Sequence, residues 1–238
     1  MPGQQLLLSP ELVRHPSVGS IEEETYLSGF TYVAGLDEVG RGPLAGPVVA
    51  AAVVLPLRFS NSDIKDSKLL SARQREKLIP LIKETALSWG VGVVEVEEID
   101  RMNILKASFL AMVRAFQVLQ PSPDCLLIDG NQVIPVEFFL PEMISTNRSP
   151  VQKAIVKGDQ LCYSIAAASI LAKVTRDGIM TDLDKSYPEY GFAKHKGYGC
   201  LSHIEAIRRF GPSPIHRKSF SLVREVCPRL ETAPPLLL

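Results

Sequence analysis

Acidic residues follow two apolar runs that lie far apart in the sequence. Asp37 and Glu38 stand side by side in VAGLDEVGRGPLAGP, and Asp129 ends the run CLLIDG. An isolated Asp-Glu pair most often lies in a solvated turn. The apolar runs that precede both acidic positions instead favour buried carboxylates that act together. Mg²⁺ prefers carboxylate oxygens and keeps several waters, so a few such ligands hold it. Two such ions about 4 Å apart can activate water and stabilise the leaving oxygen in phosphodiester cleavage.

The adjacent acids conflict with regular strand geometry. Consecutive residues of a strand point to opposite faces, so Asp37 and Glu38 can face one ion only if the pleat breaks. The following VGRGPLAG supplies residues for such a break, with Gly40 and Gly42 on either side of Arg41. Glycine lets a backbone approach a ligand closely. From the residues alone, Arg41 is only a partner of a phosphate or a carboxylate.

A long helix expected from about residue 159 to residue 185 offers two candidates for a fourth acid. Asp159 lies at its start and Asp177 far inside it. Both are on one face but about 27 Å apart along the axis, so they cannot serve one metal pair. Asp177 could pair with Lys173 one turn back, and Asp159 could be only a helix cap. Spacing alone leaves this choice open.

Runs rich in Val, Ala and Leu with Gly or Pro turns nearby predict the strands. Three are expected at residues 31–36, 48–55 and 87–96, and a fourth ends at Asp129. Ligand sites gather at strand ends in sheets covered by helices, so the three acids should converge.

Cap residues and prolines delimit the expected helices. Ser71 should cap a helix that Pro80 kinks, and Asn103 a helix that ends before Pro121. A last helix is expected at 202–210. Strands in succession, then a helix, a strand and more helices predict an α/β fold, a mixed central sheet with helices packed on it and a helical C-terminal part.

Length and composition indicate one main domain. The chain has 238 residues, of which 46% are hydrophobic, enough for a sizeable core. We expect an N-terminal arm at 1–28, the catalytic domain at 29–227 and a tail at 228–238. The longest apolar run, 47–57, falls short of the roughly 18 residues of a membrane span, so no membrane partner is expected.

The N-terminus and the cysteines indicate a cytoplasmic protein. The first residues lack the pattern of a signal peptide and include three consecutive glutamates at 22–24. The four cysteines form no C-x-x-C pair, which is typical of reduced cytosolic thiols and indicates no structural metal. No coiled-coil repeat is present, so we expect a monomer.

Net charge gives no indication of nucleic acid, because Lys plus Arg and Asp plus Glu both total 26. The distribution is uneven. Between Lys185 and Lys218 seven basic residues stand against two acids, with three histidines among them. This run is either a solvated charged face or a set of phosphate contacts that position a duplex.

Eight short motifs together resemble bacterial ribonuclease HII, a type 2 ribonuclease H family. They occur in the order found in that family and extend from about Val33 to Phe220, most of the chain. The motifs are AGLDEVGRGPLAGPVVAAAVVL, IKDSKLLS, NILKAS, LLIDG, VKGD, IAAASILAKVTRD, YPEYGFAKHKGYG and PIHRKSF.

The resemblance implies a ribonuclease H-like fold and a metal-dependent hydrolase. Such enzymes hydrolyse the RNA strand of RNA-DNA hybrids, or cut on the 5′ side of single ribonucleotides in duplex DNA, and leave 5′-phosphate and 3′-hydroxyl ends. This activity serves ribonucleotide excision in DNA replication and repair. Four acids would hold Mg²⁺ or Mn²⁺ in a two-ion mechanism, and by motif match these are Asp37, Glu38, Asp129 and Asp159. Asp177 would then be structural.

The resemblance also implies substrate-binding residues. The backbone of Gly40, Arg41 and Gly42 would sense the ribose 2′-hydroxyl, the group that distinguishes RNA from DNA. Tyr198 would pack on the sugar, whereas the residues alone favour a core aromatic with its hydroxyl satisfied. Independently of the resemblance, the basic run predicts that AKHKGYG presents Lys194, His195 and Lys196 on a loop, where they could contact phosphates. The DSK motif at 66–68 and the HRK motif at 216–218 would support the acids or contact the backbone.

Some features depart from the family pattern. Cys200 stands where threonine is expected, which could remove a hydroxyl contact. The tail has no evident clamp-binding motif. The segment before the first strand is too short for the extra N-terminal domain of ribonuclease HIII, so that subtype ranks lower. A junction nuclease indifferent to the 2′-hydroxyl and a non-catalytic hybrid-binding protein are the rival hypotheses.

Overall fold

A five-stranded mixed sheet is the centre of the molecule. The computed structural model of the chain describes residues 18–139 and 149–226. The strand order is β3-β2-β1-β4-β5; β2 is antiparallel to β1 and β3, whereas β4 is parallel to β1 and β5. The strands are β1 (Val33–Val39), β2 (Val48–Val54), β3 (Ser88–Val94), β4 (Cys125–Asp129) and β5 (Val151–Ile155). The predicted α/β class is confirmed.

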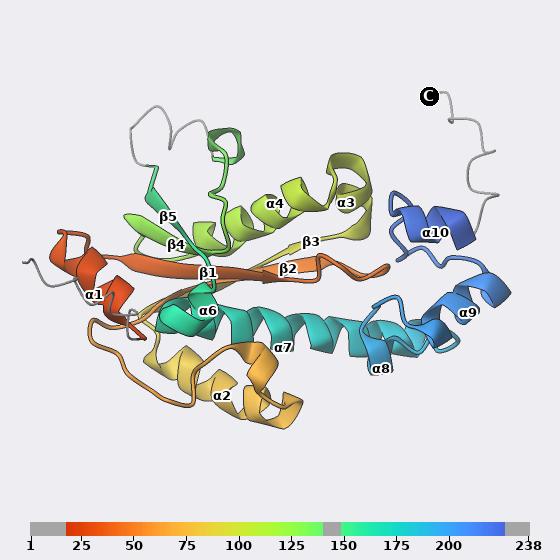
Figure 1. Ribbon diagram of the computed structural model, residues 1–238, viewed down its shortest axis with the longest axis horizontal. Helices are drawn as coiled ribbons and strands as arrows, with labels where there is room; N and C mark the ends of the chain where they lie inside the picture. The colour runs from red at the N-terminus through yellow and green to blue at the C-terminus, as the bar shows by residue number, and fades with distance from the viewer. Residues whose placement is uncertain (1–17, 140–148, 227–238) are drawn as a thin grey trace, which may run out of the picture.

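Helices cover both faces of this sheet (Figure 1). On one face lie α3 (Val96–Met102) and α4 (Ile104–Gln117), and on the other α2 (Ala72–Thr85) and α7 (Tyr163–Ser186). Strand β2 is buried throughout and serves both layers: its alternate side chains pack toward α4 and toward α7. Because three of its seven residues are alanine, both helices can approach the sheet closely.

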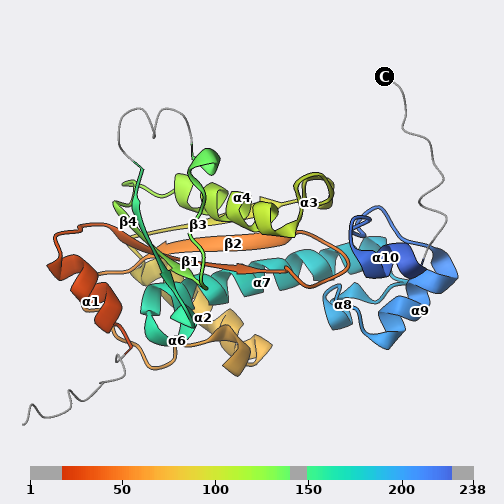
Figure 2. The same ribbon diagram turned by 45° about the horizontal axis from the view of Figure 1, so that its top comes forward.

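The C-terminal part forms a smaller helical unit at the far end of α7 (Figure 2). It contains α8 (Phe192–His195), α9 (Leu201–Phe210) and α10 (Ser221–Val226). Leu44 and Ala45, from the loop between β1 and β2, belong to the apolar core of this unit. That loop therefore connects the sheet to the C-terminal helices.

The predicted N-terminal arm contains a helix that the sequence analysis missed. Helix α1 (Ser20–Leu27) buries Thr25, and Glu22 Oε1 accepts hydrogen bonds from the backbone and hydroxyl of Ser164 at the start of α7. Residues 1–17 and the tail at 228–238 lie outside the described residues, so the domain boundaries stay a prediction.

The long predicted helix is two helices. Helix α6 (Gly158–Leu161) ends at Cys162, whose extended backbone precedes α7. The predicted strand at 87–96 ends at Val94, because α3 begins directly after Glu95. Strand β5 was not predicted, because its partly exposed residues show no clear alternation. The helix caps predicted at Ser71 and Asn103 are confirmed.

Side-chain hydrogen bonds form the caps at the starts of α2 and α4. Ser71 and Gln74 form a capping box at α2, and Asn103 Oδ1 accepts the first free amides of α4. Two 3₁₀ turns, Ser67–Leu69 and Val136–Phe138, complete the described elements. Within the described ranges, no helix is both long and apolar enough to cross a membrane.

Gly35 is the point of closest contact between β1 and α7. A methyl group there would collide with backbone atoms of Ser164 and Ile165. Gly35→Ala should lower the free energy of unfolding by about 1–3 kcal/mol or more, because backbone atoms cannot move aside as a side chain can. Urea unfolding of the purified variant measures the change.

Gly178 is the matched control for this prediction. It lies within α7, and a methyl group there meets nothing within 4 Å. Gly178→Ala should raise the free energy of unfolding by roughly 0.5–1 kcal/mol, since alanine favours helix over glycine. Equal effects of the two substitutions would contradict the packing argument.

Candidate active site

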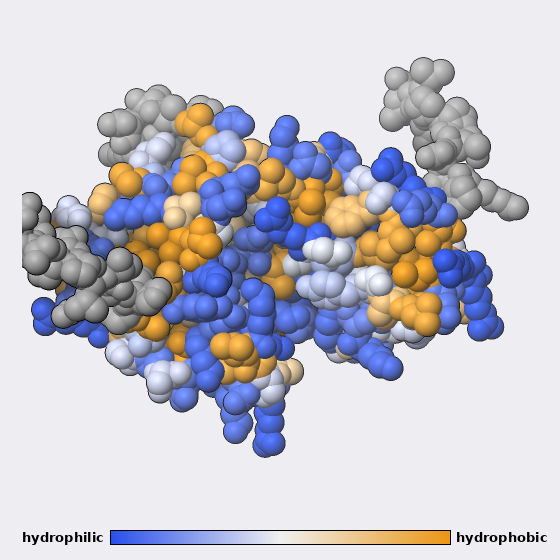
Figure 3. All heavy atoms as spheres, viewed as in Figure 1, coloured by the Kyte–Doolittle hydropathy of each residue, from blue (hydrophilic) through white to orange (hydrophobic). Residues whose placement is uncertain are grey.

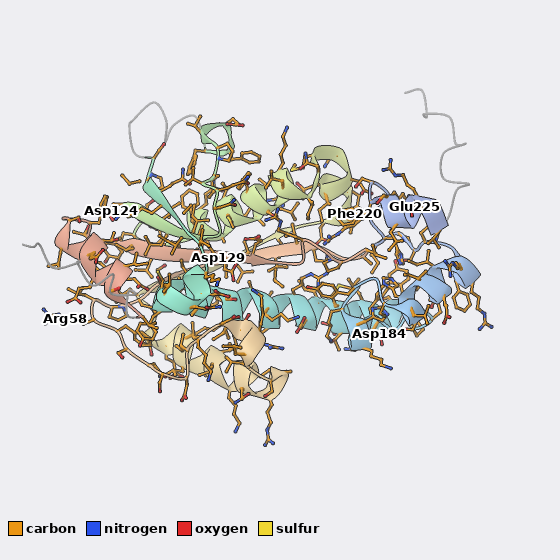
Figure 4. The ribbon with its side chains drawn as sticks, viewed as in Figure 1. Arg58, Asp124, Asp129, Asp184, Phe220 and Glu225 are labelled. Atoms are coloured by element: carbon orange, nitrogen blue, oxygen red, sulfur yellow. The ribbon has the colours of Figure 1, made fainter. Side chains whose placement is uncertain are left out.

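The register between two parallel strands brings the acidic side chains together. Leu36 of β1 is paired with Ile128 of β4, so Asp37 and Asp129 follow at the same edge of the sheet. Asp129 lies near the centre of the molecule, where β1 approaches α6 (Figure 4). The predicted convergence of these two acids is therefore present in the fold.

Asp159 joins the two strand-end acids through the turn that opens α6. The backbone N–H of Gly158 donates to Asp129 Oδ1 at 2.7 Å, which fixes the start of α6 against the end of β4. Asp177 lies elsewhere on α7: its carboxylate is 2.8 Å from Lys173 Nζ, the partner expected from the helical spacing. Of the two candidates left open by spacing, the fold brings Asp159 to the acids.

Glu38 lies on the opposite side of the sheet edge from Asp37. The sequence led us to expect a break in the pleat between these two residues. That expectation is wrong, because β1 stays paired with β2 in regular register through Val39. Asp37 is oriented toward α7, where it interacts with the hydroxyl of Ser169, whereas Glu38 lines a small cavity beside α4. Asp129 interacts with both Asp37 and Glu38, so the acidic cluster extends to both sides of the sheet at the end of β1.

Burial and mutual repulsion make these acids hard to ionise. Asp37 is only 7% exposed, and its pKa is well above the ordinary value because of burial and then of the charges on Glu38 and Asp129. Burial also raises the pKa of Glu38, although Arg41 opposes it. The pKa of Asp159 is raised by burial and by Asp129.

Two basic side chains approach the acids. Arg41 Nη1 is 3.4 Å from Glu38 Oε1, and Lys68 Nζ is 3.6 Å from Asp159 Oδ2. Burial lowers the pKa of Lys68, but Asp159 and further nearby acids outweigh that effect and raise it. Lys68 belongs to the DSK motif, whose expected support of the acid site agrees with this contact.

The residues at this site have the chemistry of a divalent cation site. All the candidate ligands are carboxylates, the hard oxygen donors that Mg²⁺ and Mn²⁺ take, and a cation would offset their repulsion. Throughout the described ranges, no three His, Cys, Asp or Glu side chains are already arranged around one metal position. Glu38 and Asp159 are instead each directed toward a basic side chain.

The loop after β1 brings its glycines into two different environments. Gly40 has a φ of 101°, and a methyl group there would collide with the side chain of Arg176. At Gly42 a methyl group would meet only Tyr198, at 3.8 Å. Tyr198 is 45% exposed. The loop and the tyrosine singled out from the sequence are therefore neighbours, with open space beside Gly42.

The segment AKHKGYG, expected to be a loop that presents three basic side chains, is partly helical and presents them differently. Residues 192–195 form the short helix α8, and His195 faces inward, where its ring stacks on His203 at 4.5 Å. Lys196 Nζ donates to Thr181 Oγ1 of α7 at 2.7 Å. Lys194 is exposed, as predicted.

The basic run as a whole is not a uniform charged face. Arg208 and Arg209 are exposed at the end of α9, but exposed apolar residues, Leu201 and Phe210, lie on the same helix. The visible face of the C-terminal part accordingly carries both hydrophilic and hydrophobic residues (Figure 3).

Sequence analysis missed two arginines behind the loop. Arg176 and Arg217 are fully buried and donate to backbone carbonyls of residues 40–47. Arg217 belongs to the HRK motif, for which only a general supporting role was expected. No local pattern distinguishes these buried arginines from solvated ones, because the loop carbonyls that they bind lie more than a hundred residues away.

The sheet order, the helices on both faces and the acids at the strand ends define a nuclease of the ribonuclease H type. The fold is similar to ribonuclease H2 of Pyrococcus horikoshii OT3, with a TM-score of 0.67, 30% identity and coverage of 85% of this chain and 100% of that one. It is also similar to the ribonuclease HII of Archaeoglobus fulgidus solved with PCNA, with a TM-score of 0.61, 26% identity and coverage of 82% and 96%.

Sequence comparison identifies the family within this class. The family model described as Ribonuclease HII matches residues 34–223. A ribonuclease HII of Ruminiclostridium cellulolyticum is 52% identical over 210 residues, which are 88% of this chain and 78% of that protein. The chain belongs to the ribonuclease HII family. It is a ribonuclease H, an endonuclease that acts on RNA-DNA hybrids, and the resemblance found in the sequence is confirmed.

The raised pKa of Asp37 predicts a pH-dependent stability. The folded protein holds this proton more tightly than the unfolded chain, whose carboxyl keeps a pKa near 3.8. The free energy of unfolding of metal-free protein should therefore fall as the pH rises above about 4. Asp37→Asn removes this titration and should flatten the decline, as measured by urea unfolding in EDTA.

Asp182 is the control for this experiment. It is an exposed acid paired with Lys185 on α7, so Asp182→Asn should leave the pH dependence as in wild type. Parallel curves for wild type and Asp37→Asn would mean that the buried acid is not responsible.

Proposed function

We propose that this chain is a divalent-metal-dependent endoribonuclease that also cuts DNA duplexes at single embedded ribonucleotides. The cut falls on the 5′ side of the ribonucleotide and leaves 5′-phosphate and 3′-hydroxyl ends. The observation that carries the proposal is the cluster of buried carboxylates directly before a loop whose Gly42 lies open beside Tyr198. The acids supply the chemistry, and the loop supplies the selection of ribose.

Asp37, Glu38, Asp129 and Asp159 are the proposed metal ligands. Mg²⁺ or Mn²⁺ bound there, as two ions, would activate water and stabilise the departing 3′ oxygen. Ribonuclease H enzymes generally depend on divalent metal, which supports this assignment. Arg41 and Lys68 each lie near one oxygen of Glu38 and Asp159, so the second oxygen of each carboxylate would be the one offered to the cation.

The loop at Gly40, Arg41 and Gly42 is the proposed reader of the 2′-hydroxyl. Its backbone can approach the sugar because Gly42 carries no side chain, and Tyr198 would pack against the same ribose. The exposed Lys194 and the basic run at 185–218 would hold the phosphate backbones without reading sequence. Lys196 donates one hydrogen bond to Thr181, which leaves two donors of its ammonium group for a phosphate.

The place of action is proposed from the cysteines. Cys125, Cys162 and Cys200 are free thiols, which fits a reducing cytoplasm. The Archaeoglobus fulgidus relative was solved with PCNA. We propose no clamp for this chain, since its tail, which has no evident clamp motif, lies outside the described residues. The monomeric state also stays a prediction.

Cleavage of matched duplexes tests the proposed function directly. One labelled DNA duplex carries a single ribonucleotide and the other none, and each is incubated with wild type or Asp129→Asn in Mg²⁺ or Mn²⁺. We expect one cut 5′ to the ribonucleotide that Asp129→Asn abolishes, because one of the proposed metal ligands is lost. Equal cutting of both duplexes would favour a nuclease indifferent to the 2′-hydroxyl, and binding without cleavage would contradict a catalytic role.

The proposed role of Gly42 predicts an effect on activity without an effect on stability. A methyl group there makes only an ordinary contact with Tyr198, so Gly42→Ala should unfold at the wild-type temperature. It should nevertheless lower kcat/KM on the single-ribonucleotide duplex by about tenfold or more, because the methyl group would keep the backbone away from the ribose. A tenfold loss corresponds to only about 1.4 kcal/mol of transition-state stabilisation. Gly178→Ala is the control and should cleave like wild type.

A further inference from the structure

Two buried arginines hold the backbone of the loop between β1 and β2. Arg217 donates to the carbonyls of four loop residues: Gly40, Arg41, Gly46 and Pro47. Arg176, from α7, donates to the carbonyls of Pro47 and Ala45. Both side chains have an exposure of 0%. The loop proposed to read the ribose is thus fixed from behind by two guanidinium groups.

Arg176 also connects the loop to the segment that carries Tyr198. Its Nη1 donates to the carbonyl of Lys196 at 3.0 Å. A backbone hydrogen bond makes a second connection between the same segments: the N–H of Leu44 donates to the carbonyl of Gly197 at 2.8 Å. The loop and Tyr198 therefore have a fixed separation before any ligand arrives.

These arginines bind carbonyls where buried arginines usually bind carboxylates. Burial, followed by the nearby charge of Arg176, lowers the pKa of Arg217 to about 9, so the group stays charged at neutral pH. Burying a charge is costly unless hydrogen bonds compensate it. The planar fork of arginine offers five donors, and backbone carbonyls take most of them here. Lysine, with one nitrogen, cannot span these carbonyls at once.

A histidine pair holds the backbone of Tyr198 from the other side. His216 Nδ1 accepts the backbone N–H of Ser213, so its proton is on Nε2, which donates to His203 Nε2 at 3.0 Å. His203 then carries its proton on Nδ1 and donates it to the carbonyl of Tyr198 at 2.9 Å. Each ring is neutral in this chain of hydrogen bonds.

Burial is the first cause of that neutrality. It lowers the pKa of His203 to about 4, while burial and then His203 lower the pKa of His216 to about 3. His216 directly precedes Arg217, whose guanidinium lies 5.1 Å from the centre of the Phe220 ring. Phe220, labelled in Figure 4, packs against both the sheet core and the C-terminal core. The residues that hold the loop and those that hold the backbone of Tyr198 are therefore linked through the adjacent pair His216 and Arg217.

We propose that Arg176 and Arg217 are positioning residues that preorganise the ribose-reading surface, holding the Gly40–Gly42 loop against Tyr198 in its binding geometry before substrate arrives. The inference rests on the proposed function of that loop. Ordering the loop during folding removes an entropic cost from binding. Its consequence is selective: loosening the loop weakens recognition of the ribose and leaves contacts to ordinary DNA backbone unchanged.

Binding of matched duplexes tests this selectivity. Affinities for the all-DNA and single-ribonucleotide duplexes are measured with Mg²⁺ in an Asp129→Asn background, which suppresses cleavage. Adding Arg217→Lys or Arg176→Lys should reduce the preference for the ribonucleotide by about tenfold or more, with the all-DNA affinity unchanged. Arg114→Lys is the control: Arg114 binds the carbonyl of Val93 and Glu98 away from the loop, so the preference should persist.

The outcomes separate this inference from the proposed function. If the Asp129→Asn reference shows no preference for the ribonucleotide, the ribose-reading role of the loop is wrong. If the reference prefers it and both lysine variants keep the full preference, the positioning role is wrong. Equal loss of affinity for both duplexes also overturns it, because that result indicates general damage.

Hydrogen exchange on the Asp129→Asn reference, which does not cleave the duplex, gives an answer even if both lysine variants fail to fold. The amides of Leu44 and Gly46 donate to the carbonyls of Gly197 and Ile215 in the free protein. A preformed loop should protect these two amides equally in the free protein and in the complex with the single-ribonucleotide duplex, because neither belongs to the Gly40–Gly42 segment that would contact the ribose. Fast exchange in the free protein that slows only on binding would overturn the inference.

Discussion

The pairing of β1 with β4 is the constraint on which the rest of the structure depends. It carries Asp37 and Asp129 to one edge of the sheet, where burial and then the charges of Glu38 and Asp129 raise the pKa of Asp37. The rest of the fold must offset this cost of burial and repulsion. The apolar layers on both faces of β2 supply the stability that offsets it, because burial of apolar surface is the dominant favourable contribution to folding.

Two parts of the molecule hold the acids and the proposed ribose-binding residues. The sheet and α6 hold the acids, whereas the C-terminal helices hold Tyr198 and the back of the loop after β1. Arg176 lies on the helix shared by both parts, and Arg217 reaches into the loop from the C-terminal segment. The acids and the proposed ribose reader therefore keep a fixed relation because α7 and the loop run through both.

The two loop glycines illustrate how one motif can serve two physical purposes. Gly40 is required by the fold, since its positive φ and its contact with Arg176 exclude a side chain. Gly42 is under no such constraint in the free protein. If it matters, the reason lies in the ligand, which explains why a sequence motif alone could not separate structural from functional glycines.

The sequence by itself determined the mixed sheet, the helix caps at Ser71 and Asn103, and the acids that end apolar runs, because each of these depends on neighbours along the chain. Tertiary structure alone decided that Asp159 joins the acids and Asp177 does not, since that depends on the turn between β5 and α6. It also decided that Arg217 is buried and His195 faces inward. Residue type and spacing cannot specify these environments, because the carbonyls that Arg217 binds are distant in sequence, and the contact of His195 with His203 depends on how α8 packs on α9.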